Sequence, residues 1–183
     1  MTKYFQAFIY IFYNAFKFTF LKIFYSINFK FHYVNFISPL TNIQLTQGSQ
    51  LIFGEKLKIR SGAKIHLRKA AEVVIGDHTF INHNSMIVSH EQIIIGKNVQ
   101  IGPNVMIFDH DHDFRSENGV SDMKYKTTPI KIGDNVWLGA NSIILRGTII
   151  GDNSVVGAGT IVKGVYRNNS TILNKKELTV LTH

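Results

Sequence analysis

The chain has 183 residues, of which 45% are hydrophobic and 17% are charged, which is enough apolar matter for a packed core and excludes a disordered chain. The length fits one domain, or one domain with a short arm. Twenty Lys and Arg against 12 Asp and Glu give a formal net charge of +8. The absence of Cys excludes disulfides, Cys-ligated zinc, iron–sulfur clusters and thiol catalysis.

Residues 1–38 are predicted to form a helical arm rich in aromatic and basic side chains. The first 36 residues hold 15 of the 22 aromatic residues, four Lys and no acid. Lys17 and Lys22 interrupt the apolar pattern, so we expect no transmembrane helix. No small-residue cleavage site follows the apolar stretch, so we expect no signal peptide.

Two roles suit this arm equally well on the sequence alone. Basic residues among large rings, without acids, are typical of a helix in an anionic membrane interface, which predicts peripheral membrane contact through residues 1–36. The alternative is that the rings pack on the body or on a partner subunit. The excess charge forms no dense Lys and Arg cluster, so no nucleic acid is expected as a partner.

From about residue 57 onward, aliphatic residues recur at a step of six. Six consecutive matches run from Ile132 to Val162, and shorter runs begin at Ile75 and Ile95. A chain of the same composition would match six specified positions with a probability of roughly 0.0004. Because a period of six is neither helical nor a plain alternation, each unit is predicted to be a short strand and a turn. Three units close one triangular coil, and stacked coils bury the aliphatic column.

The fourth position of the repeat is often Asn, where a tight turn needs a residue that tolerates positive φ. The residues concerned are Asn98, Asn104, Asn135, Asn141 and Asn153. The predicted fold class is therefore an all-β solenoid with an N-terminal helical arm. We expect the arm at residues 1–38, the solenoid at 39–166 with one extruded loop at 113–129, and a C-terminal tail at 167–183.

The repeat is interrupted between Ile107 and Ile132, where the interval is 25 residues, and the insertion begins with the segment FDHDHDF. Loops thrown out of a solenoid are where functional residues collect. Alternation in an extended segment places His110 and His112 on one side. If Ile107 points inward, His112 and Trp137 are both sixth residues of their hexads and are expected to line one outer face.

The hexads from about Ile75 to Val162 resemble those of the left-handed parallel β-helix acyltransferases, in the branch of maltose, galactoside, colanic-acid and capsular-polysaccharide O-acetyltransferases. The motif that carries the resemblance is PIKIGDNVWLGANSIILRGTIIGDNSVVGAGTIVKG, from Pro129 to Gly164. The likeness is strong over about half the chain, weak over residues 40–74 and absent from the arm. It implies a left-handed parallel β-helix, acetyl-CoA as the donor, no metal, and a homotrimer with its active site at the subunit interface.

The resemblance also assigns roles to single residues. The family places its catalytic His sixteen residues after the Gly of an IG-x-N-V hexad, and counting from Gly96 gives His112. His110 is the less favoured base, and is expected to orient His112 or to contact the acceptor. The remaining implied contacts are Asn82 and Trp137 with the acceptor, and Ala140, Ala158 and Lys163 with coenzyme A.

Alternatives stand beside three of these assignments. Asn82 also suits a turn, and Trp137 also suits packing on a neighbouring subunit. Lys163 falls where the family usually has Thr, and Gly164 replaces the Lys that commonly meets phosphate, so the cationic contact with coenzyme A is expected to be shifted by one residue. His90 falls where the relatives have an Asp that binds the acceptor, which leaves that contact in doubt.

The sequence therefore predicts an enzyme that moves acetyl from acetyl-CoA to a glycan hydroxyl, with His112 as general base. No Cys or Ser nucleophile motif is present, so direct transfer in a ternary complex is expected. The expected location is the cytoplasm. If the arm lies on the inner membrane face, the acceptor is expected to be a lipid-linked glycan of capsule or O-antigen assembly.

Two rival functions remain open on the sequence. One is an acetyltransferase for free sugars or drugs, which resembles this sequence equally in the coils. The other is a metal-dependent β-helix protein similar to the γ-type carbonic anhydrases, which resemble the chain in fold only. Their paired His residues lie five apart, whereas His110 and His112 lie two apart.

Overall fold

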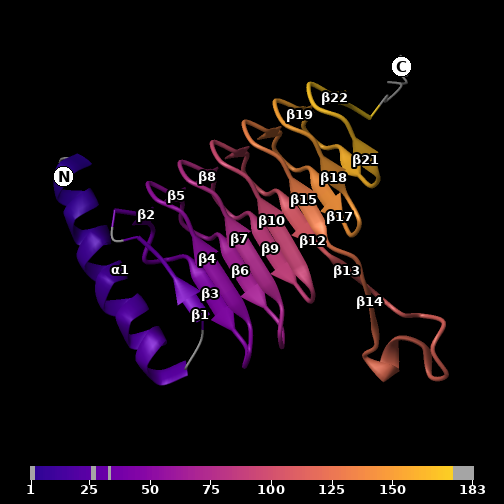
Figure 1. Ribbon diagram of the computed structural model, residues 1–183, viewed down its shortest axis with the longest axis horizontal. Helices are drawn as coiled ribbons and strands as arrows, with labels where there is room; N and C mark the ends of the chain where they lie inside the picture. Colours follow the sequence, from indigo (N-terminus) through magenta and orange to yellow (C-terminus); the bar gives the residue numbers. More distant parts are fainter. Residues whose placement is uncertain (1–2, 26–27, 33, 175–183) are drawn as a thin grey trace, which may run out of the picture.

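The computed structural model describes residues 3–25, 28–32 and 34–174, which form one long helix followed by a stack of parallel coils (Figure 1). The helix α1 (Lys3–Tyr25) lies across one end of the stack, and the last described residues lie at the other end. Within the stack each full coil adds one strand to each of three parallel sheets, here named A, B and C in chain order. This β-solenoid confirms the predicted fold class.

Every strand of a sheet pairs in parallel with the strands of the coils before and after it. Sheet A consists of β1 (Asn28–Lys30), β4 (Gln50–Phe53), β7 (Glu72–Ile75), β10 (Gln92–Ile95), β15 (Ile130–Ile132), β18 (Ile149–Ile150) and β21 (Val165–Tyr166). Sheet B consists of β2 (Phe36–Ile37), β5 (Lys58–Ile59), β8 (Phe80–Ile81), β11 (Gln100–Ile101), β16 (Trp137–Leu138), β19 (Val155–Val156) and β22 (Thr171–Ile172). Sheet C consists of β3 (Asn42–Leu45), β6 (Lys64–Leu67), β9 (Met86–Ser89), β12 (Met106–Phe108), β17 (Ile143–Leu145) and β20 (Ile161–Val162).

The aliphatic column predicted from the hexads forms the centre of the solenoid. All six residues of the long run are at most 1% exposed: Ile132, Leu138, Ile144, Ile150, Val156 and Val162. The register stacks the column coil on coil, as in the pairing of Leu138 with Val156 and of Ile144 with Val162. Because each buried side chain packs on the coils above and below it, the stack is stabilised as a unit.

The coils are longer near the N-terminus than near the C-terminus. Leu51 pairs with Val73, which makes a coil of 22 residues, whereas Ile132 pairs with Ile150, which makes a coil of 18. The longer coils have four-residue strands in sheets A and C, and the 18-residue coil has strands of two or three residues. The count of six therefore holds best in the C-terminal coils.

The corners between strands adopt the left-handed conformation that the Asn residues predicted. All five Asn positions have φ between 55° and 59°. Asn carries this conformation at a lower cost than most residues with a Cβ atom, because its short polar side chain bonds locally. The expectation about these corners is confirmed.

The first coil begins before the boundary expected at residue 39. Strand β1 already pairs with β4, and Ile37 of β2 is buried in the solenoid core. Helix α1 closes this end, with Phe18 (1% exposed) packed among the core residues and the side-chain amide of Asn14 donating a hydrogen bond to the Ile37 carbonyl at 2.8 Å. The arm thus packs on the body through one of its faces.

The other boundaries also differ from those expected. Strand β22 pairs with β19, so the solenoid continues past residue 166, and residues 175–183 of the expected tail lie outside the described residues. The extruded loop expected at 113–129 starts earlier, because β13 (His110–His112) pairs in antiparallel fashion with β14 (Tyr125–Thr127). A short 3-10 helix, η1 (Gly119–Asp122), lies within this hairpin.

Candidate active site

A hairpin projects from the stack between the fourth and the fifth coil, at the corner where sheet C gives way to sheet A (Figure 1). Strand β13 follows β12 after Asp109 alone, and β14 leads back into β15. In the hairpin register His110 faces Thr127 and His112 faces Tyr125. The two histidines of the FDHDHDF segment therefore stand at the base of the hairpin, on the strand next to the solenoid wall.

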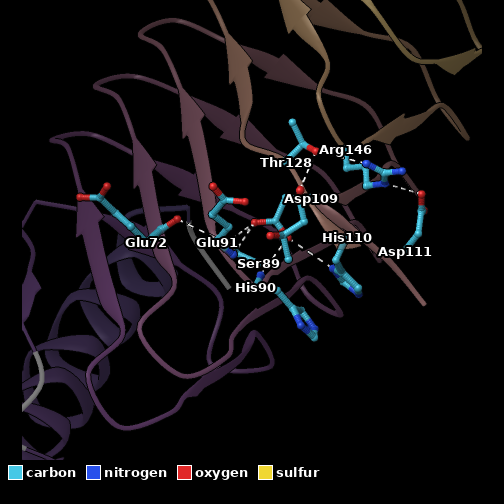
Figure 2. A network of polar contacts seen from close by, with 10 residues as sticks. Glu72, Ser89, His90, Glu91, Asp109, His110, Asp111, Thr128 and Arg146 are labelled. Carbon is cyan, nitrogen blue, oxygen red and sulfur yellow. Dashed lines mark hydrogen bonds and ion pairs between the residues drawn. The ribbon is translucent and has the colours of Figure 1, made fainter. Parts of the chain in front are cut away.

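Asp109 anchors the hairpin to the solenoid. Its side chain is fully buried and accepts hydrogen bonds from the Ser89 hydroxyl at 2.7 Å and from the backbone N–H groups of His90 and Glu91 at 2.8 and 2.9 Å (Figure 2). The Nδ1 atom of His110 lies 3.3 Å from the same carboxylate. Burial disfavours the charged carboxylate, but these four contacts outweigh burial and hold the pKa of Asp109 below its usual value.

Arg146 of the next coil holds the hairpin from another side. Its guanidinium donates to the Asp111 carboxylate and, at 3.2 Å, to the Thr128 hydroxyl (Figure 2). The backbone N–H of Thr128 in turn donates to the Asp109 carbonyl at 2.9 Å. The hairpin base is therefore tied to the coils on both sides, and a rigid scaffold of this kind fixes side-chain positions for catalysis.

Three rings cover His110. His90 stacks on it with the ring centroids 3.8 Å apart, while the rings of Tyr125 and Phe108 approach it edge-on at 5.6 and 6.0 Å. Burial first, and then the neighbouring positive charge of a protonated His110, lower the pKa of His90 to about 4. His90 is therefore neutral around pH 7.

His112 stands in a more open place than His110. It is exposed, and its ring lies 4.6 Å from that of Tyr125. The side chain of His110, by contrast, is only 15% exposed. The pair thus consists of one imidazole held by a buried carboxylate and one imidazole open to an incoming molecule.

Three of the sequence-predicted contact residues lie together on another edge, the corner between sheets B and C. They are Asn82, Ala140 and Ala158. Gly159 N–H donates to the Ala140 carbonyl at 2.8 Å, so the two Ala positions stand on adjacent coils. A Cβ atom at Gly139 would lie 2.5 Å from the backbone N of Ala158, so the coils approach too closely there for a side chain. The Asn82 side chain accepts from the His83 N–H at 2.8 Å, as expected of a turn.

Trp137 and Lys163 occupy two further places. Trp137 is 55% exposed on β16 of sheet B, whereas His112 follows sheet C, so the outer face expected to join them is not formed within one chain. The reason is that successive hexads lie on successive sheets. The hexad of His112 starts at Ile107 on sheet C and that of Trp137 starts at Ile132 on sheet A, so their sixth positions belong to different faces. Lys163 is exposed after β20, on the same corner of the solenoid as the hairpin.

Sequence reasoning missed three residues of the site, Ser89, Tyr125 and Arg146, and the anchoring role of Asp109. Ser89 precedes Asp109 by 20 residues, which is one coil of this part of the stack. A coil count applied to polar residues as well as aliphatic ones would have found that pair. No group of His, Asp or Glu able to hold a metal ion occurs among residues 3–25, 28–32 and 34–174.

Comparisons with known proteins agree with the fold. The family model described as the hexapeptide repeat of succinyl-transferase matches residues 72–108 and 129–163, on either side of the hairpin. The chain is 33% identical over 128 residues to the putative lipopolysaccharide biosynthesis O-acetyl transferase WbbJ of Escherichia coli, covering 66% of this chain and 65% of WbbJ.

Two solved structures extend the comparison. A galactoside acetyltransferase in complex with coenzyme A is 25% identical, with a TM-score of 0.50, over 85% of this chain and 64% of that one. AntD, an N-acyltransferase from Bacillus cereus in complex with dTDP and 3-hydroxybutyryl-CoA, has a TM-score of 0.66 at 20% identity, over 86% of this chain and 83% of that one. The latter likeness concerns the fold.

Residues 72–108 and 129–163 thus match a hexapeptide-repeat model, and the similar proteins include O-acetyltransferases named for lipopolysaccharide biosynthesis and for galactosides. It spans about half to two thirds of the length of the curated relatives it matches.

Proposed function

We propose that the protein is an acetyl-CoA-dependent O-acetyltransferase that acetylates a hydroxyl group of a glycan. The observation that carries the proposal is the hairpin inserted into the hexapeptide repeat, whose base holds a buried Asp109, a fixed His110 and an open His112. Support comes from relatives named as O-acetyltransferases of lipopolysaccharide biosynthesis and of galactosides.

Acetyl transfer to a hydroxyl needs a general base, because a neutral hydroxyl is a weak nucleophile. In the proposed reaction an imidazole takes the hydroxyl proton as the oxygen forms a bond to the thioester carbonyl carbon. The tetrahedral intermediate then loses the thiolate of coenzyme A, which receives the proton back from the imidazolium. Backbone N–H groups are suitable donors for the oxyanion of that intermediate.

We assign the base to His112 and a positioning role to His110. A base must come within about 3 Å of the proton it removes, and His112 is the exposed member of the pair. His110 has one ring nitrogen engaged with Asp109 and one ring face covered by His90. The ring of His110 contacts the ring of Tyr125, and Tyr125 also contacts His112. His110 thus helps to position the ring on which the imidazole of His112 packs.

A homotrimer would bring together the two edges that a single chain keeps apart. The hairpin stands at the corner after sheet C, and the Ala140 and Ala158 edge stands at the corner before it. The outer face of sheet C between them carries a stacked apolar row: Met86, Met106, Ile143 and Ile161. Met106 is 40% exposed and Ile161 is 57% exposed, as expected of a surface that packs against another subunit.

The donor site is tested first, because this needs no knowledge of the acceptor. Calorimetric titration of acetyl-CoA into the full chain is expected to show saturable binding near one site per chain. The His112→Ala variant is expected to bind equally well, which separates a base from a binding residue. Absence of binding to the wild-type chain would refute the acyltransferase proposal.

The base is then tested by rates. With a panel of free sugars and lipid-linked glycans as acceptors, His112→Ala is expected to lower kcat by about 10²- to 10⁴-fold. His110→Gln keeps a hydrogen-bonding side chain and is expected to lower kcat by a smaller factor. The opposite ranking would transfer the role of base to His110, with Asp109 as its orienting carboxylate. Activity on free sugars alone would favour the small-acceptor alternative.

A further inference from the structure

The positive charge of the chain is concentrated at one end of the solenoid. Residues 1–71 contain ten Lys and Arg and a single acid, Glu55, which is a net charge of +9. Residues 72–183 contain ten Lys and Arg and eleven acids, which is a net charge of −1. The boundary falls after the second coil, so the whole excess charge belongs to α1 and the first two coils.

Most of this charge forms a belt around the second coil, here called the basic belt. It consists of Lys56, Lys58, Arg60, Lys64, Arg68 and Lys69, all exposed. These residues extend around sheet B, sheet C and the corners on either side, so the belt faces several directions. Within the described part of the chain, none of the six has a carboxylate partner within 4.0 Å.

On sheet B the basic belt borders a groove of about 430 Å³. Lys56, Lys58 and Arg60 line it together with His78 and the rings of Phe36 and Phe80. A groove of cations and rings suits an anionic group attached to an apolar body. Phosphate headgroups of lipids have this character.

Helix α1 carries large apolar side chains on the side that faces away from the protein. The face that packs on the first coil includes Asn14 and Lys17, and the Lys17 ammonium donates to the Thr41 carbonyl at 3.1 Å. The opposite face is an arc of large exposed side chains, here called the aromatic arc. It consists of Phe8, Ile9, Phe12, Tyr13, Phe16, Phe20 and Ile23, which are between 40% and 76% exposed.

A surface helix that meets only water normally keeps its outward side polar. In α1 Phe18 packs in the core, and the seven large side chains of the aromatic arc face outward in addition. An exposed apolar surface of this kind marks a binding surface. None of the helices in the described residues is long and apolar enough to cross a bilayer.

The aromatic arc and the basic belt are placed for one planar surface. Helix α1 lies across the end of the stack, and only the first coil separates it from the second coil, which carries the basic belt (Figure 1). Neighbouring coils are about 4.8 Å apart, and an amphipathic helix sinks about 5–10 Å into a bilayer. The long side chains of the belt therefore reach the level of lipid phosphates when the arc is inserted.

We propose that the N-terminal end of the solenoid binds the surface of an anionic lipid bilayer, with the aromatic arc inserted at the interface and the basic belt on the lipid phosphates. The charge of residues 1–71 favours an anionic bilayer over a second copy of the chain at this surface. Two copies meeting through their N-terminal ends would bring two net charges of +9 together, and these would repel each other. The proposal does not depend on the acetyltransferase activity, since binding is measured without substrate.

The apolar part is tested by sedimentation of the full chain with vesicles of phosphatidylcholine alone or mixed with phosphatidylglycerol. We expect binding to the mixed vesicles to exceed binding to the neutral ones. The double variant Phe12→Ser/Phe16→Ser keeps Asn14 and Phe18 in place and is expected to weaken binding by about a hundredfold, or tenfold per ring. The matched control is Phe114→Ser in the hairpin, an equally exposed Phe at 67%, and it is expected to change nothing.

The charged part is tested with a second matched pair. Lys58→Gln/Arg60→Gln is expected to weaken binding to the mixed vesicles by about fivefold for each cation removed. Lys131→Gln/Arg167→Gln removes two exposed cations from the C-terminal coils and is expected to leave binding unchanged. An equal loss of vesicle binding in both double variants would show a general effect of net charge and would overturn the role proposed for the basic belt.

The competing occupant, a second copy, gives a different result. If copies cover the aromatic arc, Phe12→Ser/Phe16→Ser lowers the particle mass in analytical ultracentrifugation and leaves vesicle binding as it was. That outcome would overturn the proposal. A circular dichroism melt of each variant checks that the fold is kept, since only exposed side chains are changed.

Discussion

The N-terminal and C-terminal coils build the same left-handed corners from different residues. Near the C-terminus the corners carry Asn135 and Asn141, with φ of 56° and 59°. Near the N-terminus the equivalent conformation is held by Lys56 and Ala70, with φ of 56° and 59°. The backbone is the same although neither Lys nor Ala favours positive φ. Coil stacking therefore imposes the corner, and the residue only sets what the corner costs.

The two regions also differ in the contacts that they make besides strand pairing. Helix α1 covers the N-terminal coils, whereas the fifth coil has, besides its strand pairing with the fourth, contacts with the hairpin base through Arg146. The predictions below ask whether each region depends on the contacts that distinguish it, in decreasing order of expected effect.

Phe18→Ala is expected to lower the free energy of unfolding by about 3–5 kcal/mol, because it empties a fully buried ring position. Phe18 packs against Phe53 at 6.3 Å and Phe31 at 5.2 Å between ring centroids. Phe16→Ala, on the exposed side of the same helix, is expected to change it by less than about 0.5 kcal/mol. Urea unfolding followed by circular dichroism measures both. Equal effects would mean that α1 does not close the first coil.

Asp109→Asn is expected to lower the free energy of unfolding by about 2 kcal/mol, since it removes charge-assisted hydrogen bonds and places an amide among donors. Asp113→Asn, in an ion pair with Lys126 at the surface, serves as the control and should leave the melting temperature nearly unchanged. The lowered pKa of Asp109 means that its contribution is present above the unfolded pKa and is lost as the pH falls through the folded one. The melting temperature of Asp109→Asn should therefore fall less steeply at acid pH than that of the wild-type chain. Parallel curves of melting temperature against pH for the two proteins would contradict the anchoring role of Asp109.

His90 predicts a second pH dependence, at higher pH. Its pKa of about 4 in the fold is below the unfolded value, so the unfolded chain binds the proton first. Stability is thus expected to fall as the pH is lowered from about 6.5 to about 4. His90→Gln should remove part of that slope in thermal melts, whereas His83→Gln, an exposed control, should keep it. An unchanged slope in His90→Gln would show that the stack on His110 does not hold the imidazole neutral.

The smallest effects are expected at the corners themselves. Asn141→Ala should cost about 1 kcal/mol, because Ala adopts positive φ less readily than Asn and loses the hydrogen bond that the Asn141 side chain accepts from Asn104 at 3.2 Å. Ala70→Gly should stabilise the fold by about 0.5 kcal/mol, because Gly adopts φ of 59° without strain. Chemical denaturation of the two variants compares the regions directly. A cost for Ala70→Gly would mean that unfolded-state entropy outweighs corner strain there.

The sequence predicted the C-terminal coils well and the N-terminal ones poorly for a physical reason. An 18-residue coil repeats its inward positions every six residues, so Ile132 to Val162 read as one series. The 22-residue coils have four-residue strands with two inward positions each, such as Leu51 and Phe53, which breaks the count. The start of the solenoid at β1 was hidden for this reason, and because aromatic residues of the arm continue into the first coil.

The candidate site was predicted in part. The break in the repeat marked the hairpin. Alternation predicted that His110 and His112 lie on one side of the strand, and both contact the ring of Tyr125. What the sequence left out are contacts between coils and across the hairpin, such as Ser89 with Asp109. These depend on how many residues each coil contains, which the local pattern does not state. The roles of His112 and of the Ala140 and Ala158 edge stay predictions.

The number of coils sets a length in this molecule. Sheet C counts three steps from β3, in the first coil, to β12, after which the hairpin begins. At about 4.8 Å a step, the base of the hairpin stands about 14 Å above the first coil. On the membrane seat proposed above, that height would form part of the reach needed by an acceptor tethered to lipid. Gain or loss of one N-terminal coil would change this height by about 4.8 Å and leave the residues at the hairpin base unaltered. The number of coils therefore sets the distance between the N-terminal end and the candidate site.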